Sequence, residues 1–446
     1  MTAVLSSSPP TAPGRLPLLG HALAVKRDPI SFFQRLRELG GVVKIYLGPR
    51  AAYLVNDPDL IRQVFVTDAH SFDKGVFWEK VRSIVGNGLA NSSGATHLRQ
   101  RRMMQPAFHR ERIAQYADTM SAYWDKRVGG WQDGQQVSVP QEMADNALTL
   151  VATTVFSSQL GESAVDAMRS CFPKIQDGVM ARTLNPFPVL EKLPISANTR
   201  FAERIGRIWS ATQNTIEAYR AAGTHHGDLL SMFLEARDAD TGEGMDDEEI
   251  RDQVLTIALA AGDTTANGLA WGCYELCRHP EMADRIAAEV AEVACGRPLA
   301  FAVLGKLEYT NRFVQEVLRY YAFWMLMRRT LTEVPLGGVR LPAGAQVLIS
   351  PAAVHRDEHL YPLPLEFDPD RWLPERAAEV PRNAWIPFGA GNRQCIGDRF
   401  AWTEIMLGLA TICSRWRIAQ VPGQVTKEVF RISLNPSALT MTVRAR

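Results

Sequence analysis

The run FGAGNRQCIGDRF, residues 388–400, constrains the fold more than any other part of the sequence. Three glycines surround a single thiol there, that of Cys395. Glycine packs no side chain and weakens regular structure, so the run indicates a backbone that another group must approach closely. The apolar residues from about Ile396 to Trp416 predict a helix directly behind the thiol. The N-terminus of such a helix favours an anionic sulfur and lowers the pKa of the thiol.

The same run is compatible with other uses. Besides a thiolate aimed at a bound partner, it could hold a packed cysteine, a phosphate-binding glycine loop or a nucleophilic thiol. A phosphate loop is disfavoured, because no lysine followed by serine or threonine comes after the glycines and no buried strand precedes them. A nucleophile needs a histidine as its base, and only the fold can bring one to Cys395.

The composition argues against several classes of protein. Lysine plus arginine number 49 and aspartate plus glutamate 48, and this near balance argues against a nucleic-acid partner. The six cysteines form no CxxC pair, so we expect neither a disulfide framework nor a zinc site, and a cytoplasmic location fits best. Prolines interrupt the first residues, so we expect no transmembrane segment there and a disordered leader over residues 1–13.

The pattern along the chain predicts a mainly α fold with a smaller β lobe. Residues 41–57 predict a β-hairpin, and residues 333–351 predict a second sheet region. Proline breaks in the apolar segment 171–201 predict a mobile lid. No change of composition marks a boundary, so we expect a single domain over residues 1–446. We also expect a monomer. The predicted helices cover residues 97–118, 141–158, 199–222, 247–278, 280–294 and 307–321.

A family resemblance favours one interpretation of Cys395. Residues 388–397 match the pattern F-x-x-G-x-R-x-C-x-G at every fixed position. This pattern resembles the haem-binding signature of the cytochromes P450, which are haem-thiolate monooxygenases. The resemblance implies that Cys395 is the axial ligand of a haem b iron, beside Gly397. It also implies that Phe388 packs on the haem, that Arg393 pairs with a propionate, and that the haem lies between the 247–278 helix and the helix behind the cysteine.

Two further motifs agree with the resemblance. Glu316 and Arg319 in QEVLRYY share one helix face, and alone such a pair is usually a solvated ion pair. They match the E-x-x-R element of the family, and FDPDRW at 367–372 matches its later arginine segment. The resemblance therefore implies a buried network of Glu316, Arg319 and Arg371 that holds the cysteine loop. Trp372 replaces a common phenylalanine, which should leave Arg371 in place.

Polar residues interrupt the longest predicted helix at Asp263, Thr264 and Thr265. Such residues are unfavourable inside a helix unless they have a purpose, although they could also cap a new helix after Gly262. The resemblance favours another role, because A-G-x-D-T sequences mark the oxygen-activating groove of the family. It implies that Thr264 hydrogen-bonds dioxygen or an attendant water, that Asp263 relays protons, and that loosened helix pairing opens the groove.

Cations are needed for the two haem propionates. His97 and Arg101 match the H-x-x-x-R pattern of the family and lie on one helix face. Arg328 and His355 lie where relatives also place propionate contacts, although a lone histidine is more often an ordinary hydrogen-bonded residue.

The predicted substrate pocket is aromatic and aliphatic, which suits a hydrocarbon held by shape. The competing interpretation is a plain hydrophobic core, expected for about half of these residues. The candidates are Phe72, Val76, Phe77, Trp78, Ala258, Ala261, Phe323, Trp324, Met325 and Leu434.

The resemblance also implies partners and a substrate. Much of the chain is similar to soluble bacterial members that oxidise cyclic sesquiterpenes, of the pentalenene-oxygenase and albaflavenone-synthase kind, in secondary metabolism. Alternative substrates are a polyketide macrocycle or a fatty acid. A haem-thiolate sensor without turnover is a second alternative, but it has no need of Asp263 and Thr264. Electrons would come from a ferredoxin and its NAD(P)H-dependent reductase. Their docking face would carry basic residues, each of which could instead be simply solvated: Arg99, Arg102, Arg110, Arg112, Arg393 and Arg399.

Overall fold

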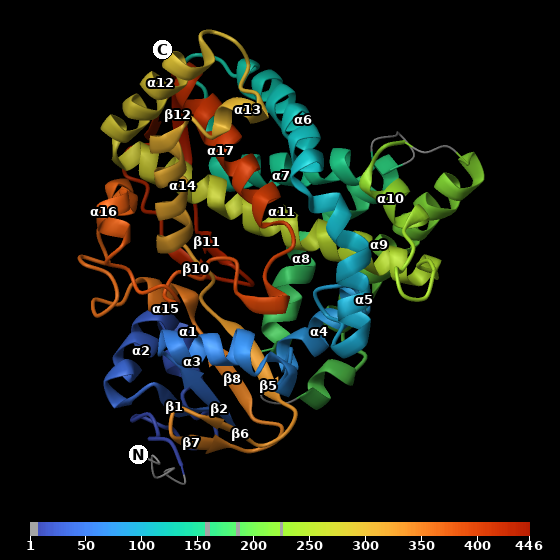
Figure 1. Cartoon of the computed structure of the whole chain (residues 1–446), viewed down its shortest axis with the longest axis vertical. Helices are drawn as coiled ribbons and strands as arrows, with labels where there is room; N and C mark the ends of the chain where they lie inside the picture. Colours follow the sequence, from blue (N-terminus) through green and yellow to red (C-terminus); the bar gives the residue numbers. More distant parts are fainter. Residues whose placement is uncertain (1–7, 157–160, 184–187, 224–225) are drawn as a thin grey trace.

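The computed structural model describes residues 8–156, 161–183, 188–223 and 226–446 (Figure 1). Helices fill the upper part of the view, and most strands gather in a smaller lobe at its lower end near the N-terminus. The prediction of a mainly α fold with a smaller β lobe is therefore confirmed. The organisation of residues 1–446 as a single domain stays a prediction.

The lower lobe is built around one five-stranded sheet with the order β1-β2-β8-β5-β3. The predicted hairpin forms its first two strands, and β2 pairs in parallel with β8, which comes from the second predicted sheet region. Two segments far apart in the sequence thus share one sheet. The strands of this lobe are β1 (Val42–Leu47), β2 (Arg50–Val55), β3 (Phe72–Asp73), β5 (Leu326–Thr330) and β8 (Gln346–Ile349), with the separate hairpin β6 (Val334–Leu336) and β7 (Val339–Leu341).

Two small sheets accompany the helices. In the first, β12 (Thr440–Ala445) lies between β4 (Gln136–Ser138) and β9 (Trp416–Gln420). The second is the antiparallel hairpin of β10 (Glu428–Phe430) and β11 (Leu434–Pro436).

Part of the helical pattern predicted from the sequence agrees closely with the structure. Two predicted helices have the predicted bounds, α11 (Asp247–Arg278) and α12 (Pro280–Ala294). The others among the described residues are α1 (Ala22–Arg27), α2 (Pro29–Leu36), α3 (Pro58–Arg62), α4 (Val76–Val85), α5 (Gly94–Met104), α6 (Arg110–Gly129), α7 (Val139–Val155), α8 (Glu162–Thr183), α9 (Ser196–Ala222), α10 (Leu229–Glu235), α13 (Phe301–Leu304), α14 (Glu308–Tyr320), α15 (Pro351–His355), α16 (Pro374–Ala377) and α17 (Asp398–Arg415).

The single helix predicted over residues 97–118 is wrong. The structure has two helices there, because α5 ends at Met104 and α6 begins at Arg110. A short 3-10 turn, η4 (Gln105–Phe108), joins them and contains Pro106. Proline lacks the N–H that would continue the α-helical pairing, which accounts for the break.

The mobile lid predicted over residues 171–201 is also wrong in its first part. Helix α8 continues through Pro173 to Thr183. Cys171, Ile175 and Val179 are buried in the main hydrophobic core, so this part of the segment is a core element. Residues 184–187 of the predicted lid lie outside the described residues.

The disordered leader predicted over residues 1–13 is too long. Residues 1–7 lie outside the described residues, but the carbonyl of Pro10 accepts a hydrogen bond from the N–H of Lys44 (2.8 Å). The N–H of Ala12 donates to the carbonyl of Lys44 (2.9 Å), and the Ala12 side chain is buried. The leader therefore joins the edge of β1. No helix in the described ranges has the length and apolar character that crossing a bilayer requires.

Helix α11 runs through the centre of the helical part and packs against α17 and α7 (Figure 1). Small residues let α11 and α17 approach closely: a Cβ on Gly268 would lie 2.6 Å from Ile405, and one on Gly408 would lie 2.6 Å from Leu269. The close contact of these helices fixes the cysteine loop, which precedes α17, relative to the polar segment of α11.

Candidate active site

A cavity of about 320 Å³ separates the cysteine loop from α11. Cys395 lies on one wall and Thr264 on another. Further lining residues come from α5, α7 and the hairpin of β10 and β11. The structure therefore brings together the two sequence motifs that the resemblance associates with chemistry.

The cysteine loop is shaped by glycine and by backbone hydrogen bonds. The N–H of Cys395 donates to the carbonyl of Phe388 (3.0 Å), and Phe388 and Gly397 also line the cavity. Gly391 has φ +70°, and a Cβ there would lie 2.1 Å from the carbonyl oxygen of Phe65. No other residue type fits this position without moving the backbone, because both the conformation and the space require glycine.

The pKa of the Cys395 thiol is raised to about 11. Burial is the largest cause, and a hydrogen bond from the Gly397 backbone opposes it. The lowered pKa that we predicted for this thiol from the helix N-terminus is therefore wrong in direction. Helix α17 begins at Asp398, after Cys395, and the desolvation of the thiolate outweighs any favourable dipole.

All six cysteines fall within the described residues, and all are free thiols. Cys395 is the one that lines the cavity. Among the described residues, His97 is the only histidine that lines it, and that imidazole has a pKa lowered to about 3, chiefly by burial. A nucleophilic thiol with a histidine base is therefore not favoured.

Positive side chains gather at the cysteine end of the cavity. Arg101, Arg328 and Arg393 line it as predicted, together with Lys74, which the sequence reasoning missed. Burial lowers the pKa of Lys74, and the charges of these three arginines lower it further. Burial likewise lowers the pKa of Arg328 and of Arg393 to about 10. The sequence offered one signal for this residue, because Lys74 is the only cation in the otherwise largely apolar run 72–78.

The prediction that His355 contacts a propionate is wrong. His355 is fully buried away from the described cavity lining. The N–H of Ile386 donates to Nε2 (2.9 Å), so Nδ1 carries the proton and donates to the carbonyl of Arg319 (3.1 Å). Burial lowers the pKa of the imidazole to about 3, so it is neutral. His355 therefore connects the end of α14 to the segment that leads into the cysteine loop.

The polar segment of α11 does not interrupt the helix. Residues 247–278 are α-helical throughout, and the hydroxyl of Thr264 donates to the carbonyl of Ala260 (2.9 Å). The predicted local loosening is therefore not present, since the threonine satisfies its hydroxyl on its own helix. Ala260, Ala261 and Thr264 line the cavity, whereas Asp263 is absent from the lining that the described residues form.

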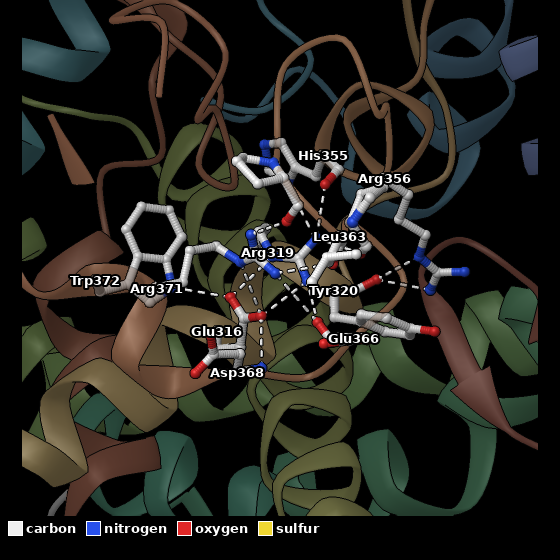
Figure 2. Close-up of polar contacts among 12 residues, drawn as sticks. Glu316, Arg319, Tyr320, His355, Arg356, Leu363, Glu366, Asp368, Arg371 and Trp372 are labelled. Carbon is white, nitrogen blue, oxygen red and sulfur yellow. Dashed lines mark hydrogen bonds and ion pairs between the residues drawn. The ribbon is translucent and has the colours of Figure 1, made fainter. Parts of the chain in front are cut away.

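Glu316 is the centre of a buried charge network (Figure 2). Arg319 donates to both carboxylate oxygens (2.8 Å each), and Nε of Arg371 lies 3.3 Å from Oε1. The backbone N–H of Asp368 (3.0 Å) and the indole N–H of Trp372 (2.9 Å) also donate to this carboxylate. Arg371 is thus in the predicted position, and Trp372 supplies a hydrogen bond that phenylalanine cannot make.

The two arginines of the network donate further hydrogen bonds to backbone carbonyls. Arg319 donates to the carbonyls of His355 (2.7 Å) and Pro364 (2.8 Å), and Arg371 donates to that of Leu363 (3.0 Å). Glu316 and Arg319 are 0% exposed, so their ionised groups are stabilised by partners within the protein and not by solvent. The network ties α14 to the irregular segment that precedes the cysteine loop.

The predicted pocket residues divide into two groups. Trp78, Ala261, Phe323 and Leu434 line the cavity. The other six are not among the described lining residues and pack elsewhere, which was the competing interpretation: Phe72, Val76, Phe77, Ala258, Trp324 and Met325. The sequence reasoning missed Leu89, Ala90, Val151, Thr154, Val155 and Ile257, which come from α7, α11 and the segment between α4 and α5.

The predicted basic docking face is smaller in the structure. Arg99 pairs with Glu249 (2.7 Å), and Arg102 pairs with Asp238 (3.0 Å) and Asp240 (2.7 Å). Their charges are thereby partly neutralised within the chain. Arg112 donates to Gln115 (2.9 Å), while Arg110 and Arg399 are exposed.

Comparison with known proteins identifies the family. A sequence model described as Cytochrome P450 matches residues 9–443. The chain belongs to the cytochrome P450 family. Two similar P450s come from Streptomyces melanosporofaciens: cyclooctat-9-en-7-ol 5-monooxygenase is 42% identical, over 95% of this chain and 94% of the relative, and cyclooctatin synthase is 41% identical, over 98% and 95%.

A third relative and a solved structure support the same family assignment. Pentalenene oxygenase of Streptomyces avermitilis is 38% identical, over 98% of this chain and 97% of the relative. The crystal structure of a cytochrome P450DA heme domain superposes with a TM-score of 0.88 at 27% identity, over 99% of this chain and 98% of that one. The chain is therefore a P450 monooxygenase with the fold of this family.

The cofactor of a P450 is a haem bound through a cysteine thiolate. The described residues fit this group on two independent grounds. The cavity offers one free thiol, and the cluster of Lys74 with three arginines has no carboxylate among the lining residues. Buried cations of like charge repel one another unless an anion joins them, and the two propionates of a haem supply that charge.

Replacement of Glu316 by glutamine should lower the free energy of unfolding by about 3–5 kcal/mol, because two buried guanidinium groups lose their counter-charge. Denaturant unfolding of the haem-loaded protein measures this loss. The matched control is Glu333→Gln, which breaks the exposed pair with Arg340 (2.8 Å) and should change the unfolding free energy little. Equal effects of the two substitutions would contradict the structural role of the network.

Gly391→Ala should destabilise the cysteine loop more than strain alone explains. The control is Gly344→Ala, because Gly344 has φ +79° but no atom within 4 Å of a Cβ. In that control the free energy of unfolding should fall only by the cost of placing alanine in the left-handed conformation, about 1–2 kcal/mol. Gly391→Ala adds the clash with Phe65, so we expect a larger loss of stability and less haem per protein in absorbance measurements. Similar haem content in both variants would show that the loop moves at little cost.

Proposed function

We propose that Cys395 supplies the thiolate ligand of the haem and that the chain oxidises a cyclic terpene. His97, Lys74, Arg101, Arg328 and Arg393 hold the propionates in this proposal. Phe388 packs on the ring system, and Gly397 leaves room beside the sulfur. The observation that carries the proposal is a cavity whose wall contains the free thiol, the cation cluster and Thr264 together.

The bound haem supplies the activation of dioxygen by two electrons. One oxygen atom enters a C–H or C=C bond of the substrate, and the other leaves as water after taking up two protons and the two electrons. The protein must deliver those protons without admitting bulk solvent. We assign this task to Thr264, which is on the cavity wall, and to Asp263, whose carboxyl group holds the proton that is passed on.

The walls of the cavity favour a neutral, lipophilic substrate. The charged side chains among the described lining residues all belong to the cation cluster that the propionates occupy. The remaining wall is largely aliphatic and aromatic, with Val151, Val155, Ile257, Phe323 and Leu434 as examples. A fatty acid would need a further cation for its carboxylate, and this lining offers none. A fatty acid is therefore the weaker alternative.

The names of the relatives support a terpene. Cyclooctat-9-en-7-ol and pentalenene are cyclic terpenes without an ionised group. Our sequence prediction of a cyclic sesquiterpene remains one member of this broader class, and hydroxylation and epoxidation are both open to the proposed site. A polyketide macrocycle is the remaining alternative.

We propose that electrons come from a ferredoxin and its NAD(P)H-dependent reductase. The exposed residues Arg110 and Arg399 would provide positive charge for an acidic donor. Monomeric state and cytoplasmic location also stay predictions.

Titration of the haem-loaded ferric protein tests the substrate class. The compounds are pentalenene, a cyclic terpene alcohol, a macrolactone and palmitate. We expect a saturable low-spin to high-spin shift of the Soret band with the terpenes, because a lipophilic molecule that fits the cavity displaces water from it. A shift with palmitate or the macrolactone alone would contradict the terpene assignment but leave the haem site standing.

Cys395→Ser tests the ligand assignment. We expect this variant to lose the thiolate-type absorption band of the reduced carbon monoxide complex, because the sulfur that defines the band is removed. Cys295→Ser is the control, since Cys295 is an exposed free thiol outside the cavity. Retention of the band in Cys395→Ser would overturn the assignment.

A further inference from the structure

The carboxylate of Asp263 is held chiefly by the C-terminal hairpin. The hydroxyl of Ser433 donates to Oδ2 of Asp263 at 2.5 Å. Ser433 lies in the turn between β10 and β11, remote from α11 in sequence. Thr264 faces the cavity, whereas the neighbouring Asp263 points to the hairpin, as the rotation of about 100° between successive helical residues allows.

Hydrogen bonds fix the direction in which the Ser433 hydroxyl points. The side-chain amide of Asn267 donates to the Ser433 oxygen (2.7 Å) and to the backbone carbonyl of Asp263 (2.8 Å). Asn435 in turn donates to the side-chain oxygen of Asn267 (2.7 Å). Because the Ser433 oxygen accepts from Asn267, its own hydrogen is free for Asp263. Ser433 thereby stabilises a negative charge on Asp263.

The backbone that carries Ser433 is itself anchored. The indole N–H of Trp271 donates to the carbonyl of Leu434 (2.8 Å), and that of Trp324 donates to the carbonyl of Arg431 (2.7 Å). The N–H of Arg431 also donates to the carbonyl of Ser433 (3.0 Å), which closes the turn. Ser433 is only 5% exposed. A hydroxyl on such a fixed backbone can hold an acid in one orientation.

Ser433 also connects the acid to the cavity. It lines the cavity together with Leu434 and Asn267, whereas Asp263 does not belong to the described lining. The charged neighbour of Asp263 is Arg431, which lies 3.3 Å from Asp177 of α8. Burial raises the pKa of Asp263, and the hydrogen bond from Ser433 opposes that rise.

We propose that Ser433 is a positioning residue for proton delivery, which holds the Asp263 carboxyl against the cavity-lining turn, connects it to the cavity and stabilises its ionised form. The hairpin of β10 and β11 therefore has two roles, since the turn that bounds the substrate space also positions the carboxyl group of Asp263. This inference rests on the proposed role of Asp263, and Ser433 acts through that residue.

The experiment compares Ser433→Ala, Ser433→Thr and Asp263→Asn in the haem-loaded protein. Ser437→Ala is the matched control, because Ser437 follows the same strand, accepts a hydrogen bond from the Lys427 N–H (2.9 Å) and does not touch Asp263. A surrogate ferredoxin system supplies electrons, and pentalenene is the probe. The readouts are oxygen-dependent NADPH oxidation, which consumes protons whichever product forms, and its dependence on pH. Unfolding curves and the carbon monoxide spectrum establish that each variant is folded.

We expect Asp263→Asn to slow NADPH oxidation about 100-fold, the loss typical of a missing general acid. Ser433→Ala should slow it about tenfold, as for a lost hydrogen bond to a charged group. Without the serine donor the pKa of Asp263 rises, so the pH above which the rate falls should move upward in Ser433→Ala. Ser433→Thr keeps the hydroxyl and should restore both rate and pH profile, and Ser437→Ala should match the parent protein.

Other outcomes separate the inference from the proposed function. If Asp263→Asn turns over like the parent, the proposed proton role of Asp263 fails, and the inference fails with it. If Asp263→Asn is slow but Ser433→Ala matches Ser437→Ala, the role of Asp263 stands and that of Ser433 is refuted. A slow Ser433→Ala with an unshifted pH profile, or without rescue by threonine, assigns Ser433 a purely structural role and overturns the inference.

Discussion

The buried carboxylate of Glu316 is the interaction on which the rest of the site depends. Its charge is balanced by Arg319 and Arg371, and these arginines direct their other N–H groups to carbonyls of the irregular chain between α15 and the cysteine loop. That stretch contains only short turns and the four-residue α16, so the charge network supplies much of the constraint that a long helix or a sheet supplies elsewhere. The loop can then present a thiol to the cavity without regular structure on its N-terminal side.

Charge is distributed unevenly around the cavity, and this division indicates which kind of ligand each end can bind. Lys74 and three arginines meet at the cysteine end, where each lowers the pKa of a neighbour, while aliphatic residues of α7 and α11 form the opposite wall. An anionic, planar cofactor and a neutral substrate are the ligands that satisfy both ends at once. Asp263 is kept out of this space and reaches it through the C-terminal hairpin.

The sequence predicted the features that are local or carried by a specific motif. The bounds of α11 and α12 followed from their periodic apolar residues, and the thiol loop followed from its glycines. Other features depended on tertiary contacts. His355 has the spacing of a ligand contact, but backbone groups occupy both of its ring nitrogens. Lys74 carries no motif, and Ser433 meets Asp263 only because the last hairpin folds back onto α11. The apolar residues near Phe72 and Trp324 could not be divided between core and cavity without the fold.

The neutral His355 makes the connection between α14 and the cysteine loop sensitive to acid. Its pKa is about 3 in the fold, against an ordinary value of 6.5. Below pH 6.5 His355 binds a proton in the unfolded chain but stays neutral in the folded chain. The free energy of unfolding therefore falls as the pH decreases from about 6.5 toward 3. Protonation would also place a cation beside Arg319 and remove the acceptor for the Ile386 N–H. Acid therefore weakens the attachment of the thiol loop to α14.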